Sequence, residues 1–259
     1  MLDLLNELAN STGAGVRVAV VDSGVEAGHP WVGQRLTAAY NVDSSSFKVV
    51  KVTPGDVFGH GTACAGQIRR FAPDVELISV QILGGNLQGN SHALLAALHW
   101  LTTQDVNVVN LSLSTMREQF ALQMSAAVDE LYARNVPCVC AQGYHLSGVA
   151  YPTNFAGTIG VWYGKMPAGK IEFRPQKAVA FNAAGSNVKV AWNNGGTRVI
   201  EGSSFACPLV CGLAARIQSV RKGLTPYEVQ TLLKAYAERQ AQGWWEEWMG
   251  KVDNDPVSR

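Results

Sequence analysis

The sequence predicts an α/β domain of three layers, in which a central parallel sheet is flanked by helices. Apolar runs of strand length alternate along the chain with stretches of helical periodicity, the pattern of a doubly wound sheet. The runs contain few polar residues, which is typical of strands covered by helices on both faces. With 259 residues and 47% hydrophobic composition, the chain can bury a large core in one such domain.

Four largely apolar runs are the predicted strands. They cover residues 16–21, 77–82, 106–113 and 137–141. Asp22 directly follows the first run. Because ligands of parallel sheets bind at the carboxyl ends of the strands, Asp22 is expected at the functional edge of the sheet.

Helices are expected between and after these strands. They cover residues 61–68, 91–101, 120–132 and 204–216. Pro208 falls in the first turns of the last of these, where proline is tolerated. A final helix is predicted after Thr225, because Thr225 can cap it, Pro226 suits the first helical position and Glu228 completes a capping box.

The chain shows no internal repeat and no low-complexity linker, so residues 1–259 are predicted to form a single domain. Its core extends over about residues 16–233, and a tryptophan-rich tail covers residues 243–259. The tail has three tryptophans at helical spacing: Trp244, Trp245 and Trp248. They are expected to pack on the domain body, and docking to a partner is the alternative.

Charge and hydropathy argue against several classes of protein. The formal net charge of +1 argues against a nucleic-acid-binding surface and a polybasic membrane patch, and no stretch approaches the length of a membrane span. Residues 1–8 carry acids where a secretory signal would carry lysines, and they lack its long apolar run. We therefore expect a cytoplasmic protein that binds neither nucleic acid nor membrane.

Five cysteines form no even disulfide framework, which favours a reducing compartment. They are Cys64, Cys138, Cys140, Cys207 and Cys211. Free cysteines are often buried as small apolar side chains, and that is the preferred interpretation of these five. A metal cluster or a redox pair is the alternative.

Three short segments carry residues that act together in acyl-transfer chemistry. They read Asp-Ser-Gly at residues 22–24, His-Gly-Thr at 60–62 and Gly-Ser-Ser-Phe-Ala-Cys-Pro at 202–208. A serine hydroxyl is a poor nucleophile at neutral pH unless an imidazole takes its proton, and the imidazole needs a carboxylate to hold its tautomer. Asp22, His60 and Ser204 supply these three groups.

The segments resemble the three signatures of the subtilases, the subtilisin-like serine proteases of peptidase family S8. The resemblance extends from about Val16 to about Leu233, and the chain order Asp, His, Ser is that of subtilases. It implies a subtilisin-like fold and a serine endopeptidase without a cofactor. It also implies that Ser204 is the nucleophile, that His60 is the general base and later the acid, and that Asp22 orients the imidazole.

The oxyanion hole is where the sequence departs from the family. Subtilases usually have Ala-Ala-Gly-Asn here, and the Asn donates a hydrogen bond to the oxyanion; in this chain Tyr144 occupies the Asn position. The candidates for a substitute donor are Tyr144, His145 and Gln142. The backbone N–H of Ser204, at the start of its helix, is expected to donate as well. Without a substitute donor the site would be catalytically weak.

Substrate contacts are implied by the resemblance alone. Relatives clamp an extended peptide between two backbone segments, which match residues 87–89 and 111–114. Leu94 and Leu113 match positions that line the fourth upstream pocket, which implies an apolar preference there. The other positions carried over are Gly89, Ser112, Ser114, Ala141 and Gly143.

Three further departures from the family bear on the cleft and on metal binding. Ser114 stands where relatives have a glycine, and Gln142 stands where they have a small residue, so cleft width and first-pocket preference stay open. Many relatives bind structural Ca²⁺ in an Asn-rich loop after the His helix, whereas residues 67–73 run straight on here. Because Arg69 and Arg70 would repel a cation, we expect this calcium site to be missing and assign no metal.

These observations lead to one preferred function and two alternatives. The preferred function is a cytoplasmic serine endopeptidase with restricted peptide or protein substrates, such as precursor peptides, acting through an acyl-enzyme on Ser204. The rival is a subtilase-fold peptide-binding protein with weak or no turnover, because Tyr144 replaces the usual oxyanion Asn. An esterase or a peptide ligase would use the same triad, and nothing in the sequence separates them.

Overall fold

A nine-stranded sheet forms the centre of the computed structural model, which describes residues 2–143 and 148–241. Its strands are β1 (Arg17–Asp22), β2 (Leu36–Val42), β3 (Val49–Lys51), β4 (Glu76–Gln81), β5 (Val108–Leu111), β6 (Cys138–Ala141), β7 (Thr158–Gly164), β8 (Ile171–Phe173) and β9 (Phe181–Ala184). Their order in the sheet is β3-β2-β4-β1-β5-β6-β7-β9-β8. Neighbours from β2 to β9 are parallel, and only the edge strands β3 and β8 run antiparallel.

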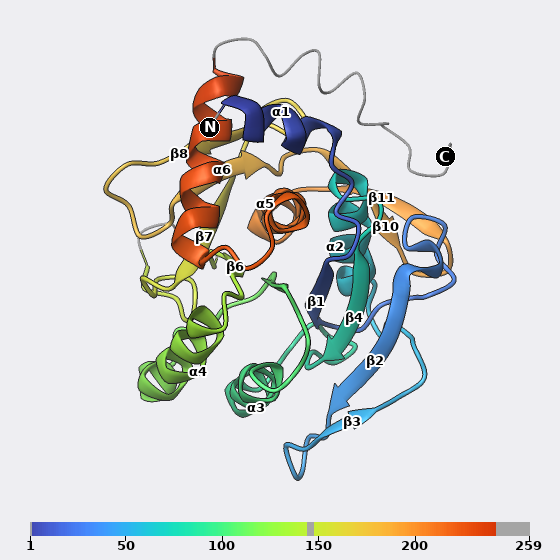
Figure 1. Cartoon of the computed structure of the whole chain (residues 1–259). Coiled ribbons are helices and arrows are strands. Elements are labelled where there is room, and N and C mark those ends of the chain that lie inside the picture. Colours follow the sequence, from blue (N-terminus) through green and yellow to red (C-terminus); the bar gives the residue numbers. More distant parts are fainter. Residues whose placement is uncertain (1, 144–147, 242–259) are drawn as a thin grey trace.

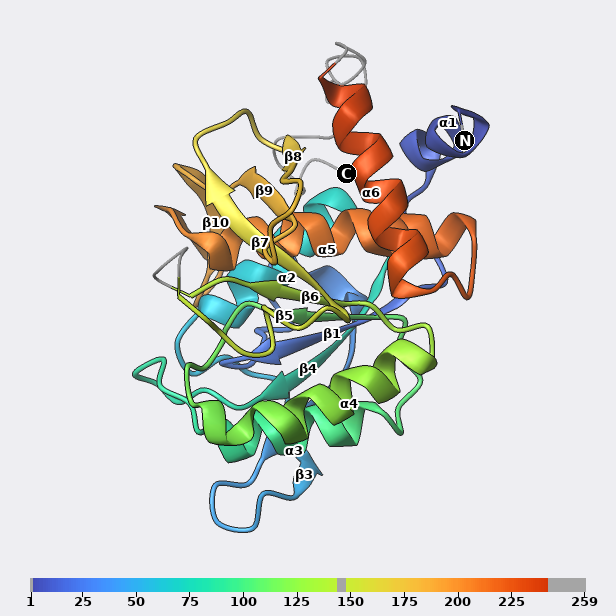
Figure 2. The ribbon, with the colours of Figure 1, turned by 90° about the vertical axis from the view of Figure 1, so that its left-hand side faces the viewer.

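Helices cover both faces of this sheet, which confirms the predicted α/β fold of three layers (Figures 1 and 2). They are α1 (Leu2–Asn10), α2 (His60–Phe71), α3 (Ser91–Leu101), α4 (Ala121–Ala133), α5 (Ser203–Val220) and α6 (Pro226–Gln240), with short 3-10 turns at Gly33–Arg35 and Glu118–Phe120. Figure 2 shows α3 and α4 side by side on one face and α2 and α5 on the other. The helices α1 and α6 pack against α5.

The central strand β1 shows how the sheet divides the core. Val18 and Val20 belong to the core under α2 and α5, whereas Ala19 and Val21 belong to the core under α3 and α4. Successive side chains of a strand point to opposite faces. The same alternation directs Asp22, the last residue of β1, toward the side of the sheet that carries α2 and α5.

Most predicted elements are present, with shifted ends. The helix α3 has the predicted bounds, and the capping box of Thr225 and Glu228 at the start of α6 is formed. The strand β5 is shorter than the run predicted over 106–113, because after Leu111 the chain leaves the sheet. The tryptophans of the tail, Trp244, Trp245 and Trp248, lie outside the described residues, so their packing stays a prediction.

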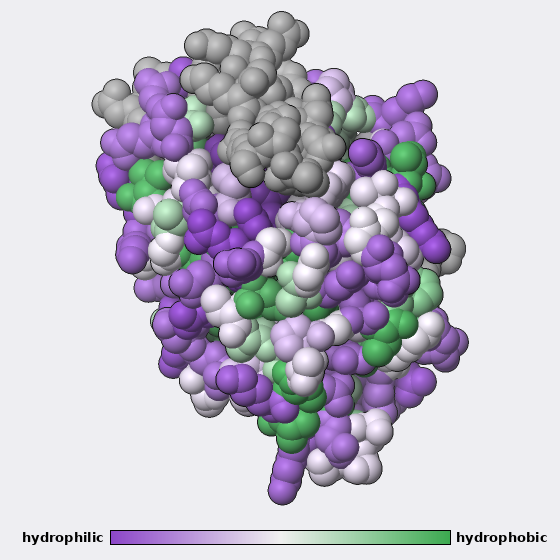
Figure 3. Space-filling model, turned by 90° about the vertical axis from the view of Figure 1, so that its right-hand side faces the viewer, coloured by the Kyte–Doolittle hydropathy of each residue, from purple (hydrophilic) through white to green (hydrophobic). Residues whose placement is uncertain are grey.

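A separate hairpin of β10 (Val188–Trp192) and β11 (Gly196–Ile200) packs on α2. Figure 3 shows the face of the molecule that carries the β3 edge of the sheet. Hydrophilic residues predominate there, and hydrophobic residues form small separate groups. Among the described residues, no helix is long and apolar enough to cross a membrane.

Candidate active site

Asp22 and His60 meet at the carboxyl edge of the sheet. Asp22 ends β1, His60 begins α2, and both side chains are buried. Nδ1 of His60 lies 2.8 Å from Oδ1 and 2.9 Å from Oδ2 of Asp22. Because a carboxylate only accepts hydrogen bonds, Nδ1 carries the hydrogen, and Nε2 is left as the nitrogen that can take a proton.

Glycines allow the backbones around this pair to approach one another. A Cβ atom on Gly61 would overlap the carbonyl oxygen of Gly24, and a Cβ atom on Gly24 would overlap that of Gly55. Gly24 also has a φ of +105°, which L-residues with side chains rarely adopt. The end of β1 and the start of α2 can therefore be this close only with glycine at both positions.

Ser204 lies in the first turn of α5, and its backbone is held next to the Asp22–His60 pair. The Ser204 carbonyl accepts hydrogen bonds from the Ser112 hydroxyl at 2.9 Å and from the Cys64 thiol at 3.5 Å. The Cys64 sulfur also lies 3.9 Å from Nδ1 of His60 and 3.7 Å from Oδ2 of Asp22. One thiol thus contacts all three residues that the sequence motifs single out.

The Ser204 hydroxyl points away from the imidazole. It donates a hydrogen bond to the carbonyl oxygen of Ser112 at 3.0 Å, and no bond joins it to His60 in the described part of the chain. The next residue, Phe205, lies against the imidazole with ring centroids 5.3 Å apart. The structure therefore brings Asp22 and His60 into direct contact and places Ser204 beside them without a serine–imidazole hydrogen bond.

The charge on His60 is set by two opposing influences. Burial is the largest and disfavours the imidazolium, but the nearby Asp22 carboxylate, together with Cys64, outweighs it and raises the pKa of His60 well above its usual value. Burial, followed by the same carboxylate, raises the pKa of the Cys64 thiol to about 12. Cys64 is therefore protonated at neutral pH and acts as a hydrogen-bond donor.

One residue of the site, Asp56, was missed by sequence reasoning. Its Oδ1 accepts hydrogen bonds from the Ser23 hydroxyl and from the N–H groups of Phe58 and Gly59, at 2.7–3.0 Å. Its Oδ2 accepts from the N–H and the hydroxyl of Thr62, at 2.8 and 2.6 Å. Asp56 thus ties the end of β1 to the first turn of α2. An acid just before a helix is a capping signal, and this one lies four residues before His60.

Two N–H groups at the start of α5 are available to an oxyanion. The N–H groups of Phe205 and Ala206 are the first to bond the carbonyl of Gly202, so those of Ser203 and Ser204 precede the ladder of the helix. An N–H at a helix start favours negative charge. The geometry of Ser204 thus suits the donor role that the sequence predicts for its backbone.

Of the three predicted side-chain donors, the structure describes one. Gln142 is 1% exposed, and its Nε2 donates to the carbonyl of Gly148 at 2.8 Å. That hydrogen bond occupies the amide nitrogen of Gln142 with the loop that contains Gly148. Tyr144 and His145 lie outside the described residues, so a donor role for either stays a prediction.

One of the predicted substrate-binding positions, Ser112, lies directly against Ser204. Ser112 exchanges two hydrogen bonds with Ser204, one from each hydroxyl to the other carbonyl. Gly89 forms an isolated antiparallel bridge with Leu83. A Cβ atom on Gly143 would lie 3.1 Å from the hydroxyl of Ser114, so these two predicted positions are neighbours.

The apolar positions among them are largely buried. Leu94 is 2% exposed within α3, and Leu113 is partly buried against the core under α3 and α4. Ala141 ends β6 and is 1% exposed.

Asp22, His60 and Cys64 each carry a side-chain atom that could bind a metal ion. Their ligand atoms lie within 4.8 Å of one another, and within the described ranges this is the one group of three such residues. Nδ1 of His60 is already bonded to Asp22, and the Cys64 thiol keeps its proton, so the geometry suits the hydrogen-bonded pair. Where a calcium loop would interrupt α2, the helix runs unbroken to Phe71.

An α/β fold with a buried Asp–His pair beside a serine at a helix start defines the class of serine hydrolases. Comparison with known proteins gives the family. The model of the peptidase S8 subtilase family matches residues 13–251, which is most of the chain. The chain therefore belongs to the subtilase family.

Relatives and solved structures agree with this assignment. M-protease of Shouchella clausii (strain KSM-K16) is 28% identical over 234 residues, covering 86% of this chain and 59% of that protein. Subtilisin Savinase of Lederbergia lenta is 28% identical and is covered to 83% of its length. The solved structure of sphericase covers 87% of this chain and 84% of its own, with a TM-score of 0.74 at 24% identity, which shows the shared fold. The chain thus spans about three fifths of the length of M-protease.

Proposed function

We propose that this protein is a serine endopeptidase that hydrolyses peptide bonds through an acyl-enzyme on Ser204. The observation that carries the proposal is the buried pair of His60 and Asp22, with Nδ1 between 2.8 and 2.9 Å from both carboxylate oxygens. This contact holds the imidazole in the tautomer whose Nε2 can take a proton. Family membership and the position of Ser204 at the start of α5 support the same chemistry.

The reaction begins when the Ser204 hydroxyl turns from the Ser112 carbonyl toward Nε2 of His60. Catalytic hydrogen bonds of this kind often form only when substrate is bound. His60 takes the hydroxyl proton as the oxygen attacks the peptide carbonyl, and the N–H of Ser204 stabilises the oxyanion. His60 then gives the proton to the leaving amine, and water repeats the sequence on the acyl-enzyme, while Asp22 stabilises the imidazolium.

The setting proposed for this activity is the cytoplasm, with a restricted set of targets such as precursor peptides. Five buried cysteines, none of them paired, support a reducing compartment. We expect all five to react with a thiol reagent only after unfolding, because burial raises the pKa of thiols such as Cys138. A disulfide detected in protein isolated from its native cells would contradict this setting.

The rival function is a peptide-binding protein of the subtilase fold. The replacement of the family's oxyanion Asn by Tyr144 favours it, and so does the hydrogen bond that turns the Ser204 hydroxyl toward Ser112. The substitution Tyr144→Asn separates the two functions. In an endopeptidase with a substitute donor it leaves turnover unchanged or lowers it, whereas in a binding protein it creates turnover where none existed.

A fluorophosphonate probe tests the proposal directly. Wild-type protein should be labelled and should cleave an internally quenched peptide library, and Ser204→Ala should do neither. Ser219→Ala is the matched control, because Ser219 lies near the far end of the same helix and its hydroxyl donates to the Arg216 carbonyl. Folded wild-type protein that is never labelled would refute the proposed function.

A further inference from the structure

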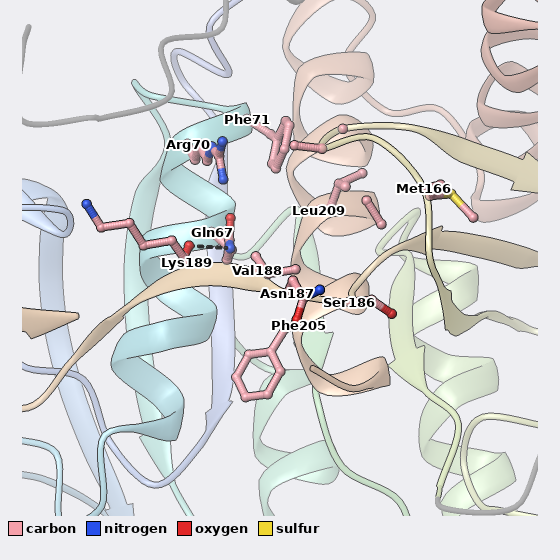
Figure 4. A pocket seen from close by; sticks show the side chains of 13 residues that line it. Gln67, Arg70, Phe71, Met166, Ser186, Asn187, Val188, Lys189, Phe205 and Leu209 are labelled. Atoms are coloured by element: carbon pink, nitrogen blue, oxygen red, sulfur yellow. Dashed lines mark hydrogen bonds between the residues drawn. The ribbon is translucent and has the colours of Figure 1, made fainter. Parts of the chain in front are cut away.

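A pocket lies between α2 and α5, on the side where the chain passes from β9 into β10 (Figure 4). Its cavity volume is about 400 Å³, which is enough for an amino-acid derivative. The last turns of α2 contribute Gln67, Arg70 and Phe71, and α5 contributes Leu209. None of these side chains takes part in the proposed reaction.

Gln67 lines this pocket and has a hydrogen-bond acceptor without a partner among the described residues. Its side chain is 1% exposed, and its Nε2 donates to the carbonyl oxygen of Lys189 at 3.2 Å. Because a carbonyl can only accept, the amide nitrogen must face Lys189, and Oε1 is turned away from Lys189 (Figure 4). Oε1 is buried and has no hydrogen-bond partner among the described residues. A buried amide oxygen without a donor is unfavourable, so a ligand N–H is well placed to satisfy it.

The charge of the pocket favours an anion. Thirteen residues line it, all within the described part of the chain, and none of them is Asp or Glu. Arg70 and Phe71 follow Gln67 by three and four residues, which puts them on the same face of α2. A guanidinium has five N–H donors and can bind a carboxylate alongside other partners. The second cation, Lys189, extends its ammonium group away from the pocket over the ring of Trp31.

The remaining walls are apolar. Phe71 and Leu209 are each 2% exposed, and Met166 faces them from the loop after β7 (Figure 4). Phe205 closes the pocket toward the active site and also lies against the imidazole of His60, with centroids 5.3 Å apart. A ligand in the pocket would therefore touch a residue that contacts the proposed general base.

We propose that this pocket binds the C-terminal residue of a peptide whose last side chain is apolar. The carboxylate pairs with the guanidinium of Arg70, the amide N–H of the same residue donates to Oε1 of Gln67, and the side chain lies against Phe71 and Leu209. Peptide hydrolysis releases such carboxyl termini, so the identification of the ligand as a reaction product rests on the proposed function. Binding itself does not depend on turnover.

Calorimetry with N-acetyl-leucine tests the proposal, using the full chain with Ser204→Ala so that catalysis plays no part. N-acetyl-leucine should bind, and N-acetyl-leucinamide, which lacks the carboxylate, should bind about ten- to a hundredfold more weakly, the range expected for loss of a hydrogen bond to a charged group. Adding the substitution Arg70→Gln should weaken the binding of N-acetyl-leucine by a similar factor. Lys189→Gln is the matched control, because its ammonium lies outside the pocket, and it should leave binding unchanged.

Met166→Glu provides a second variant on a loop, where it leaves both helices intact and places a negative charge opposite Arg70. It should also weaken binding of N-acetyl-leucine, while thermal melts check that each variant is folded. Equal binding of the acid and the amide, or equal binding by the Arg70→Gln and Lys189→Gln proteins, would overturn the proposal. Binding that fails here while the fluorophosphonate probe still labels wild-type protein would overturn the pocket assignment alone.

Discussion

Replacing Asp56 by asparagine tests whether the turn before α2 sets the position of His60. The substitution keeps the size and shape of the side chain but removes its charge and turns one acceptor into a donor. The carboxylate accepts five hydrogen bonds, three on Oδ1 and two on Oδ2. An amide has a single oxygen, so it can serve only one of these two groups.

The size of the effect follows from those contacts. If the amide oxygen serves the three donors formerly on Oδ1, the buried N–H of Thr62 loses its acceptor, at a cost of about 1–3 kcal/mol. The three remaining bonds lose the charge of their acceptor, at about 0.5–1 kcal/mol each. We therefore expect the free energy of unfolding to fall by about 3–6 kcal/mol. A shift of His60 by about 1 Å would lower kcat/KM by about 10²-fold.

Denaturant unfolding and peptide hydrolysis measure the two effects, the latter at a temperature where both proteins are folded. A positioning role predicts that kcat falls while KM changes little. Asp43→Asn is the matched control, because Asp43 also accepts four hydrogen bonds, from Ser45 and Ser46, but in an exposed turn away from His60. Wild-type stability in Asp56→Asn, or activity equal to that of Asp43→Asn, would refute the reasoning.

Three further predictions follow from the site and the helix ends. Because the pKa of His60 is raised above 6.5, its imidazolium stabilises the fold at low pH, and this contribution is lost as pH rises through the raised pKa. The value of kcat/KM should rise over the same pH interval, since the neutral imidazole is the general base. Asp22→Asn should move this rise in kcat/KM to lower pH and should lower kcat about 10⁴-fold. Gly61→Ala should lower stability by about 1–3 kcal/mol and abolish probe labelling, and labelling at the wild-type rate would contradict it. Thr225→Ala should lower the free energy of unfolding by about 1 kcal/mol. Thr231→Ala removes a side-chain hydrogen bond on the exposed face of α6 and should leave the free energy of unfolding nearly unchanged. Equal melting temperatures for the two variants would argue against the capping box.

The buried centre of the fold was predictable because each of its elements has a strong local signal. Residues 18–21 of β1 are all apolar and buried, and Thr225 with Glu228 marks the start of α6. The outer strands lack such signals. In β2, for example, buried and exposed side chains mix along Leu36–Val42, because the strand lies near the edge of the sheet. Hydrogen bonding to its neighbours β3 and β4 makes this segment a strand.

Short sequence motifs identify the residues that carry the proposed chemistry. Only certain residue types fit where two backbones approach closely or where a helix begins, and this restriction makes the motifs recognisable. The contacts between these residues depend on the tertiary structure. Asp22 and His60 come into contact because a parallel sheet directs the end of β1 toward α2, and Ser204 joins them because α5 packs on the same face. The hydrogen bonds of Asp56, the orientation of the Ser204 hydroxyl and the unused oxygen of Gln67 depend on contacts between segments far apart in the chain. No local pattern encodes such contacts, so folding alone decided them.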